Sequence, residues 1–428
     1  AESVPFLPDA LSSLHDRIAQ GKARRKAVAC SELAVLGSSD RDPLGILQAQ
    51  NASRLSDLVP LRTQRMSASE FAFYRGTAAI MAADLADSPD SGISVASCGD
   101  AHVANFGLYA GPQRTLVFDL NDFDEAAWAP WEWDVKRLVT SVIVAARSTN
   151  RADAVTLEAA SECISTYLSS LGAAVKKSPS QRFFSHYTPA QSANLLEGTS
   201  RQVLDEAART ASKRTGERAV RRLTTKGDDG RLQFIEKPPT MMHQPAGTTD
   251  QLAELIDQYR QSVQVDIQVL LRQYELVDFA RRVVGVGSVG TRCYLGLFQS
   301  GVDDARLLQV KEAGESVLIE YGRAEQPEQV AARIGELGDG GRVVGLQRIL
   351  QAVSDPLLGY LRGPKHDFYV RQFHDMKGSV EVETLDDAQF AQYSQACGAV
   401  LARAHSQSPT APAVVGYAGK GRAVSQAI

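Results

Sequence analysis

The sequence predicts an α+β protein with two lobes, a small lobe built on an antiparallel sheet and a mostly helical lobe. Residues 67–172 alternate helical periodicity with short strand-like runs, which predicts helices around a few small strands. Residues 276–313 contain three strand-like runs in succession, joined by short turns. A chain of 428 residues is long enough to form more than one hydrophobic core.

Composition excludes several classes of protein. The hydrophobic fraction of 44% is ordinary for a globular protein, and a net charge of -4 creates no field that would attract nucleic acid. No apolar run approaches the roughly 20 residues that a membrane span needs, and the first residues lack the apolar core of a signal peptide. The five cysteines are far apart and form no CxxC pair. We therefore expect a cytoplasmic protein with reduced, mostly buried thiols, no membrane contact and no nucleic-acid partner.

Changes in periodicity divide the chain into five segments. They are an N-terminal helical and loop segment (1–66), a segment with acidic motifs in the helical lobe (67–150), a helical insert (151–275), the small sheet lobe (276–385), and a C-terminal helix and tail that pack on the helical lobe (386–428).

The predicted elements follow in order. The first part contains a helix at 67–87, a strand at 92–100, two short strands around the Gly-Pro turn at 111–112, helices at 132–148 and 153–172, mixed helix and loop at 176–250, and a long helix with one break at 249–274. The second part contains three strands within 276–313, helices at 327–337 and 343–354 separated by a Gly-rich break, a strand at 367–373, a long helix at 386–408, and a loop-like, mobile tail.

The run "VVGVGSVG" places Gly285, Gly287, Ser288 and Gly290 in G-x-G-x-x-G spacing after a strand. A dinucleotide-binding loop needs a helix directly after the glycines, but "TRCYLGLFQSG" predicts a strand, so that function is excluded. A kinase nucleotide loop instead needs a second strand, a turn and a third strand with a lysine, which Lys311 in "LLQVKEA" supplies. A simple glycine-rich turn beside a surface lysine is the alternative.

The run "CGDAHVANFG" places Asn105 five residues after Asp100, the spacing of a kinase catalytic loop. There the aspartate orients or deprotonates the acceptor hydroxyl, and the asparagine holds a metal ion. The following run "FDLNDFDEA" supplies further carboxylates, which would repel one another without a cation among them. We favour Asp122 as the second metal ligand and keep Asp119 and Asp124 open, with Mg²⁺ as the metal.

The order of these motifs is reversed relative to a kinase, because the Asp100 loop precedes the Gly285 loop by about 185 residues. A circular permutation would reconcile the order, provided that residues 276–320 fold beside Asp100 and Asp122. The helix within 386–408 would then correspond to the one that normally leads into the catalytic loop.

Other residues are assigned from their surroundings. We expect His102 to orient its loop and Asp134 to tie that loop from a following helix. Arg75, Arg371 and Lys377 are candidates to line the cleft and meet phosphate or substrate, and the backbone near Gln372 is the candidate adenine-facing hinge. A kinase lysine pairs with a helix glutamate. Here that partner is Glu312, Glu328 or Glu336, or the pair is absent.

A series of motifs resembles one bacterial family. It comprises "FAFYRGTAAIMAADLA", "CGDAHVANFG", "FDLNDFDEA", "WEWDVKRL", "VVGVGSVGTRCY", "VKEA" and "DFYVRQFHDMKGS". Together these motifs are similar to the family called domain of unknown function 2252, over roughly residues 20 to 420. The resemblance implies a relation to the protein-kinase-like fold and no activity of its own. The run "DFD" with Asp122 resembles the metal motif of the aminoglycoside-phosphotransferase-like branch of that fold.

Three classes of function are compatible with the motifs. The first is an ATP- and Mg²⁺-dependent phosphotransferase that acts on a hydroxyl of a small acceptor, with the insert at 176–275 shaping the acceptor pocket. The second is a nucleotide-binding protein of the same fold that transfers AMP or nothing. The third is a metallophosphoesterase, suggested by "GDAH", although that chemistry needs several histidine ligands that the sequence does not display.

Overall fold

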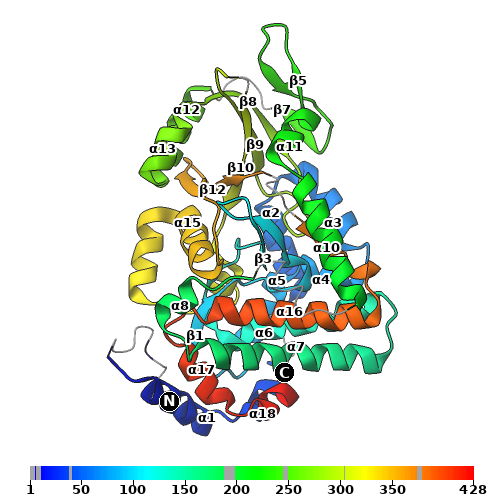
Figure 1. The fold of residues 1–428 in the computed structure, drawn as a ribbon, viewed down its shortest axis with the longest axis vertical. Helices are drawn as coiled ribbons and strands as arrows, with labels where there is room; N and C mark the ends of the chain where they lie inside the picture. Colours follow the sequence, from blue (N-terminus) through cyan, green and yellow to red (C-terminus); the bar gives the residue numbers. More distant parts are fainter. Residues whose placement is uncertain are drawn as a thin grey trace.

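A computed structural model shows a mixed α+β protein with antiparallel sheets. A six-stranded sheet occupies one end of the molecule, and a group of helices that includes both terminal segments occupies the other (Figure 1). The structure describes residues 5, 11–37, 41–187, 198–243, 249–302, 304–373 and 378–428.

The large sheet has the strand order β11-β12-β10-β9-β8-β7, and all neighbouring strands are antiparallel. Its strands are β7 (Met241–His243), β8 (Glu275–Arg282), β9 (Cys293–Gln299), β10 (Ala305–Ala313), β11 (Gly359–Arg362) and β12 (Asp367–Gln372). The three strands predicted within 276–313 are confirmed as β8, β9 and β10. Because side chains alternate along a strand, Leu307, Gln309 and Lys311 of β10 share one face of the sheet.

Helices cover both faces of this sheet. On the face opposite Lys311, Tyr259 of α12 (Thr249–Ser262) packs with Leu308 of β10. On the face that carries Lys311, α11 (Gly216–Leu223) buries Val220 against Leu295 and Leu307. The predicted break in the 249–274 helix is confirmed, since α13 (Val265–Leu271) follows separately.

Helix α15 (Glu328–Leu350) lies between β10 and β11 in the chain and packs on β11 and β12. It contains the predicted glycine-rich break, because Gly338 has a φ of 73°, a left-handed conformation that glycine adopts without strain. A Cβ at Gly340 would lie 2.3 Å from the carbonyl oxygen of Phe368, so glycine permits the helix to approach β12 closely.

Two small sheets carry the acidic motifs. Strand β1 (Ser94–Ser97) pairs with β4 (Ala127–Pro130). Strand β2 (Phe106–Ala110) pairs with β3 (Leu116–Leu120), which confirms the two strands predicted around the Gly-Pro turn, and β13 (Gly378–Ser379) extends that sheet. The Asp100 loop therefore connects β1 to β2, and the Asp122 loop connects β3 to β4.

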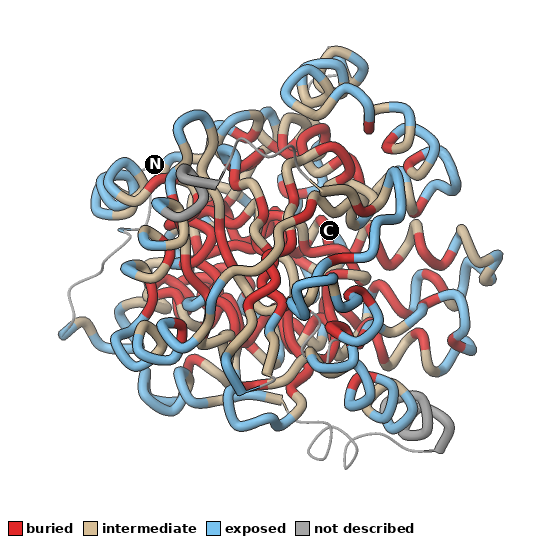
Figure 2. Tube along the Cα trace, turned by 90° about the horizontal axis from the view of Figure 1, so that it is seen from above, coloured by how far each residue is buried: buried red, intermediate tan, exposed pale blue. Residues whose placement is uncertain are grey.

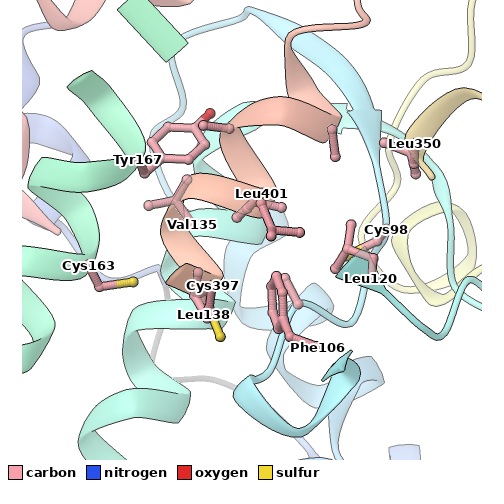
Figure 3. Close-up of a cluster of buried hydrophobic side chains, with 14 of the residues drawn as sticks. Cys98, Phe106, Leu120, Val135, Leu138, Cys163, Tyr167, Leu350, Cys397 and Leu401 are labelled. Atoms are coloured by element: carbon pink, nitrogen blue, oxygen red, sulfur yellow. The ribbon is translucent and has the colours of Figure 1, made fainter. Parts of the chain in front are cut away.

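The helical end is built on α6 (Trp131–Ser148), α7 (Asp153–Ala174) and α16 (Asp387–His405). Their side chains form a continuous core with the small sheets, where Leu401 of α16 and Leu138 of α6 lie near Phe106 of β2 (Figure 3). Buried segments run through the centre of the molecule and exposed ones around its rim (Figure 2). All five cysteines are buried and free, as predicted. Among the described helices, none is both long and apolar enough to cross a bilayer.

Three expectations about secondary structure are wrong: those for the 67–87 helix, for the insert and, as described below, for the C-terminal tail. The 67–87 helix is two helices, α4 (Glu70–Arg75) and α5 (Ala78–Ala86), because the chain turns at Gly76 beneath the Gly-rich loop. The insert contains the strands β5 (Thr224–Lys226), β6 (Leu232–Phe234) and β7, which are too short to show a periodicity.

The C-terminal tail is not loop-like. It forms α17 (Ala411–Ala418) and α18 (Arg422–Ala427), which bury Tyr417 and Val424. The remaining helices are α1 (Leu14–Ala27), α2 (Pro43–Ala52), α3 (Val59–Met66), α8 (Pro179–Phe183), α10 (Gly198–Lys213) and α14 (Val317–Glu320), with short 3-10 turns η1 (Cys30–Ala34), η2 (Ser56–Leu58), η3 (Val103–Asn105) and η4 (Val382–Thr384).

The packing of α17 on α1 depends on a close approach of two backbones. A Cβ at Gly416 would lie 2.0 Å from the carbonyl oxygen of Ile18. We expect Gly416→Ala to lower the free energy of unfolding by about 1–3 kcal/mol, since overpacking forces the helices apart. Gly172→Ala is the matched control, because nothing lies within 4 Å of a Cβ there, and it should stabilise α7 by about 0.5–1 kcal/mol. Denaturant unfolding measures both, and equal effects would contradict the packing argument.

Candidate functional site

A cavity of about 120 Å³ lies under the Gly-rich loop and brings together motifs that are far apart in the sequence. Its lining comes from the Asp100 loop, the Asp122 loop, the Gly-rich loop and the N-terminal segment. The residues are Gln50, Arg54, Arg75, Gly76, Ala78, Asp100, His102, Asn105, Asp122, Asp124, Glu125, Gly285, Val286, Gly287, Ser288 and Thr291.

The backbone of the Asp100 loop is held by Asp134 from α6. The Asp134 carboxylate accepts hydrogen bonds from the backbone N–H groups of Cys98 (2.7 Å) and Gly99 (3.0 Å), which confirms the predicted tie. Gly99 has a φ of 79° and lies directly against the backbone of Glu125, where no side chain would fit. The backbones of the Asp100 and Asp122 loops therefore pack directly against each other at Gly99.

The carboxylate of Asp100 is paired with Arg137 of α6. Arg137 donates from Nε to Asp100 Oδ1 at 2.9 Å, and its Nη2 lies 2.8 Å from the same oxygen. His102 Nε2 lies 3.6 Å from Asp100 Oδ2, and burial lowers the pKa of His102 to about 4, so it is neutral at pH 7. This placement fits an orienting role for His102. Asn105 donates from Nδ2 to the Asp100 carbonyl at 2.8 Å, which leaves its amide oxygen as an acceptor.

Lys311 reaches across from β10 to the Asp122 loop. Its ammonium group contacts Asp124 directly and lies 3.7 Å from Asp122 Oδ1. Burial alone would lower the pKa of Lys311, but the two carboxylates outweigh burial and raise that pKa well above its usual value. Tyr369 of β12, which is opposite Lys311 in the sheet, donates to Asp124 Oδ1 at 2.7 Å. The condition set for the circular permutation, that residues 276–320 fold beside Asp100 and Asp122, is therefore met.

A helix glutamate does not pair with Lys311 in the described part of the chain. Glu312 binds Arg292 and His366, and Glu336 binds Arg333. Helix α15 contacts the site through Arg342 instead, whose Nη2 donates to the carbonyl oxygens of Asp124 (2.9 Å) and Gly314 (2.7 Å).

Several predicted site residues lie outside the cavity. Asp119 is buried, and its carboxylate accepts from the N–H groups of Leu120 (2.8 Å) and Ala352 (2.7 Å), which is a structural role and argues against metal binding. Gln372 donates from its side chain to Asp355 at 2.8 Å, away from the cavity. Gly290 faces the N-terminal segment, where its carbonyl accepts from Leu55 N–H at 2.8 Å. Lys377 lies outside the described residues.

Arg371 occupies the sheet face beside Lys311 without lining the cavity. Its Nε donates to Gln309 Oε1 at 2.9 Å, and its guanidinium lies 5.7 Å from the ring centre of Tyr369. This charge lies close enough to Asp122 and Asp124 that the two carboxylates help to raise the pKa of Arg371. The Asp122 loop therefore faces two cations from the sheet.

The residues around the cavity suit a metal that is bound together with phosphate. Asp122, Asp124 and the Asn105 amide oxygen offer only oxygen ligands, which Mg²⁺ prefers, and Mg²⁺ usually takes one or two carboxylates plus substrate phosphates. In the described part of the chain, three His, Cys, Asp or Glu side chains nowhere cluster closely enough to hold a metal ion by themselves.

Sequence reasoning assigned no role to four residues of the site. Arg54 and Glu125 line the cavity, and Arg137 and Arg342 hold its acidic loops. Burial raises the pKa of Glu125 to about 7. Two of them had a signal in the sequence: Glu125 belongs to the acidic run "FDLNDFDEA", and Arg137 lies three residues after Asp134 and so on the same helix face. The insert at 176–275 was expected to shape the acceptor pocket, but none of its described residues lines the cavity. Residues of the N-terminal segment, such as Gln50 and Arg54, line it instead.

These features define a mixed α+β protein in which a Gly-rich loop and several carboxylates line one small cavity, while the buried Lys311 contacts two of those carboxylates without lining the cavity itself. The chain belongs to the bacterial family described as "Uncharacterized protein conserved in bacteria (DUF2252)", whose sequence model matches residues 54–428. No curated protein and no solved structure matches the chain.

Proposed function

We propose that this protein is an ATP- and Mg²⁺-dependent phosphotransferase with a circularly permuted, protein-kinase-like fold, which acts on a hydroxyl of a small acceptor. One observation carries the proposal: the Gly285–Ser288 loop and Asp100, about 185 residues apart in the chain, line the same cavity. Kinase chemistry requires this meeting of a phosphate-covering loop with an acceptor-orienting aspartate.

The connectivity supports the same proposal. Strands β8, β9 and β10 follow the kinase sequence of strand, Gly-rich loop, strand, turn and lysine strand, and the first long helix after the lysine strand is α15, which comes after the single-turn α14. The end of α16 lies beside β1, because Ala96 N–H donates to Ser408 Oγ at 2.9 Å and Thr410 Oγ1 donates to the Ser94 carbonyl. A permuted chain would be cut at this point, between the helix and the catalytic loop that follows it in kinases.

The roles follow from the contacts. Asp100 would orient or deprotonate the acceptor hydroxyl, with its own position fixed by Arg137. Mg²⁺, when bound, would neutralise phosphate charge, and Asp122, Asp124 and Asn105 would hold it. Lys311 would exchange part of its contact with Asp124 for a phosphate oxygen. Catalysis would then consist of positioning and charge neutralisation.

A second candidate is nucleotide binding with transfer of AMP, or with no transfer. One observation favours it, and a second bears on how either candidate would bind its base. Lys311 pairs with Asp124 where a kinase lysine pairs with a helix glutamate. Helix α11 also covers the sheet face around Leu307, next to Phe373 at the end of β12, where the predicted hinge would receive adenine. A base must therefore displace α11 or lie outside the sheet.

Nucleotide-dependent stabilisation and label transfer test the proposal together. We expect ATP with Mg²⁺ to raise the unfolding temperature of the full chain, and ATP without Mg²⁺ to raise it less. Label from the γ-phosphate should then appear on a hydroxylated acceptor in a screen of small molecules, whereas label from the α-phosphate would indicate AMP transfer. A chain that no nucleotide stabilises, with or without Mg²⁺, would refute both candidates.

A metallophosphoesterase is disfavoured by the residues present. That chemistry uses two metal ions held about 3.5–4 Å apart by several ligands. His102 is the histidine at the cavity, and it is buried against Asp100 and Phe71. The described residues offer no cluster of three metal-binding side chains to which it could contribute.

A further inference from the structure

The N-terminal segment contributes positive charge to the cavity from outside the kinase-like motifs. Arg54 follows α2, and Arg75 ends α4, and both line the cavity opposite its carboxylates. The Nε atoms of both arginines are buried and find no hydrogen-bond partner among the described residues. Buried guanidinium N–H groups without acceptors are costly. Several other arginines share this feature, but Arg54 and Arg75 have it while lining one cavity, where a single anion could reach both.

A third arginine, Arg62, is buried close to Arg54 and Arg75. Arg62 of α3 is only 2% exposed, and it donates to neutral oxygens, those of Asn51 (2.7 Å), Gln50 (3.3 Å) and Gly76 (3.3 Å). Burial and the nearby charge of Arg54 lower the pKa of Arg62 to about 10. Burial also lowers the pKa of Arg54, although Glu125, Glu312 and Asp124 partly offset this from a distance. The positive side of the cavity therefore has nearby carboxylates but no described carboxylate in direct contact.

The carboxylates across the cavity do not balance the charge of these arginines by direct contact. Asp100 is paired with Arg137, and Asp122 and Asp124 face Lys311. None of the described carboxylates forms an ion pair with Arg54, Arg62 or Arg75. The cavity thus has an acidic side suited to a cation and an arginine side suited to an anion.

The Gly-rich loop joins the two sides. Arg54 donates from Nη1 to the Val289 carbonyl at 2.7 Å, and a Cβ at Gly287 would lie 2.9 Å from the Arg75 carbonyl oxygen. The loop is therefore seated on the segment that carries both arginines, and Gly285–Ser288 line the space between them. A volume of about 120 Å³ is too small for a nucleotide, since ligand sites of that kind occupy about 300–1,000 Å³, but it suits a phosphoryl group.

We propose that Arg54 and Arg75, with the Gly285–Ser288 loop, form a binding site for a terminal phosphoryl group. Guanidinium groups bind phosphate through paired, charge-assisted hydrogen bonds, and an arginine supplied beside a transferred phosphoryl group stabilises its charge. The assignment rests on the proposed function for the identity of the donor as ATP. The phosphoryl site itself requires only a phosphate chain.

Calorimetric titration of the full chain in Mg²⁺ buffer tests this site with three probes: ATP, ADP and inorganic tripolyphosphate. We expect Arg75→Gln and Arg54→Gln each to weaken ATP and tripolyphosphate binding at least tenfold, and to weaken ADP binding less than threefold. The Arg75→Lys variant should bind ATP and tripolyphosphate with intermediate affinity, because lysine keeps the charge but lacks the paired N–H donors of the guanidinium group. It also keeps the test valid if the glutamine variant folds poorly.

Arg65→Gln is the matched control. Arg65 belongs to the same segment and donates to the Gly285 carbonyl at 2.6 Å, but it does not line the cavity. Its loss should leave the affinities for ATP, ADP and tripolyphosphate within threefold of the wild type. A larger loss would mean that Arg54 and Arg75 act only by holding the Gly-rich loop.

The outcomes separate this site from the proposed function. Unchanged ATP and tripolyphosphate affinities in the Arg54 and Arg75 variants would overturn the site and leave ATP binding intact. Tripolyphosphate binding that depends on both arginines, without ATP binding, would support the site and refute the nucleotide. A wild-type chain that binds none of the three probes would overturn both. Equal losses in Arg65→Gln would also overturn the site.

Discussion

An Asp100→Asn variant is expected to lose phosphoryl transfer by a factor of about 10²–10⁴ while it keeps its affinity for ATP and Mg²⁺. Asp100 lines the cavity, and its carboxylate is held by Arg137; in the proposed function it orients the acceptor hydroxyl, whereas the Gly-rich loop and Lys311 serve the nucleotide. Asparagine keeps the shape of the side chain and one acceptor oxygen for Arg137. It cannot take a proton from the acceptor.

The choice of asparagine avoids an ambiguity that alanine would create. Removal of the whole side chain would leave Arg137 buried without its carboxylate, and breaking a buried ion pair costs about 3–5 kcal/mol of stability. Asp278→Asn is the matched control, since Asp278 is a mostly buried aspartate bound to His243 outside the cavity. Transfer at wild-type rate in Asp100→Asn would show that Asp100 has no role in the chemistry.

Lys311→Met is expected to abolish the stabilisation by ATP and Mg²⁺. At a ligand concentration of one hundred times the dissociation constant, binding should stabilise the wild-type chain by about 2.7 kcal/mol. Lys311 is the cation on the sheet that directly contacts Asp124, and methionine keeps its bulk without the charge. The effect is measured as the ligand-induced shift of the unfolding midpoint at several nucleotide concentrations.

The shift must be compared within each variant, because the substitution also changes the free protein. Without the ammonium group, Asp122 and Asp124 lose the cation that they share, and the repulsion between the two carboxylates is less offset, which destabilises the fold. Lys226→Met, at an exposed position on β5, serves as the control and should keep the full shift. If Lys311→Met responds to ATP and Mg²⁺ as the wild type does, Lys311 does not contact the nucleotide.

Local patterns in the sequence predicted those parts of the site that depend on neighbouring residues. Asp100, Asn105 and Asp122 were found because a catalytic loop and a metal loop have fixed spacings, and the structure places all three at one cavity. Lys311 was found because a strand follows the Gly-rich loop where a dinucleotide site would need a helix. Each inference needed only a few consecutive residues.

Features that depend on packing over long distances were not predictable in this way. In the sequence, Asp119 looks like the other aspartates of its acidic run. Its structural role becomes visible only in the fold, where its carboxylate accepts a hydrogen bond from the Ala352 N–H. Arg54 reaches the cavity because residues 54–55 dock on the Gly-rich loop, more than 230 positions away. The tail looked like a loop because its glycines and prolines suggest turns, whereas Gly416 serves a close helix contact.

The ion pair between Lys311 and Asp124 sets a constraint on how the protein is made. These residues are 187 positions apart, and the carboxylates come first. At a synthesis rate of about 5–20 residues per second, the lysine emerges roughly 10–40 s after them. For most of that interval the acidic loops have neither their cation nor the Gly-rich loop above them, since residues 285–290 emerge only shortly before Lys311. The proposed phosphoryl site therefore cannot be complete before the second half of the chain has emerged, so the cavity is assembled late in synthesis.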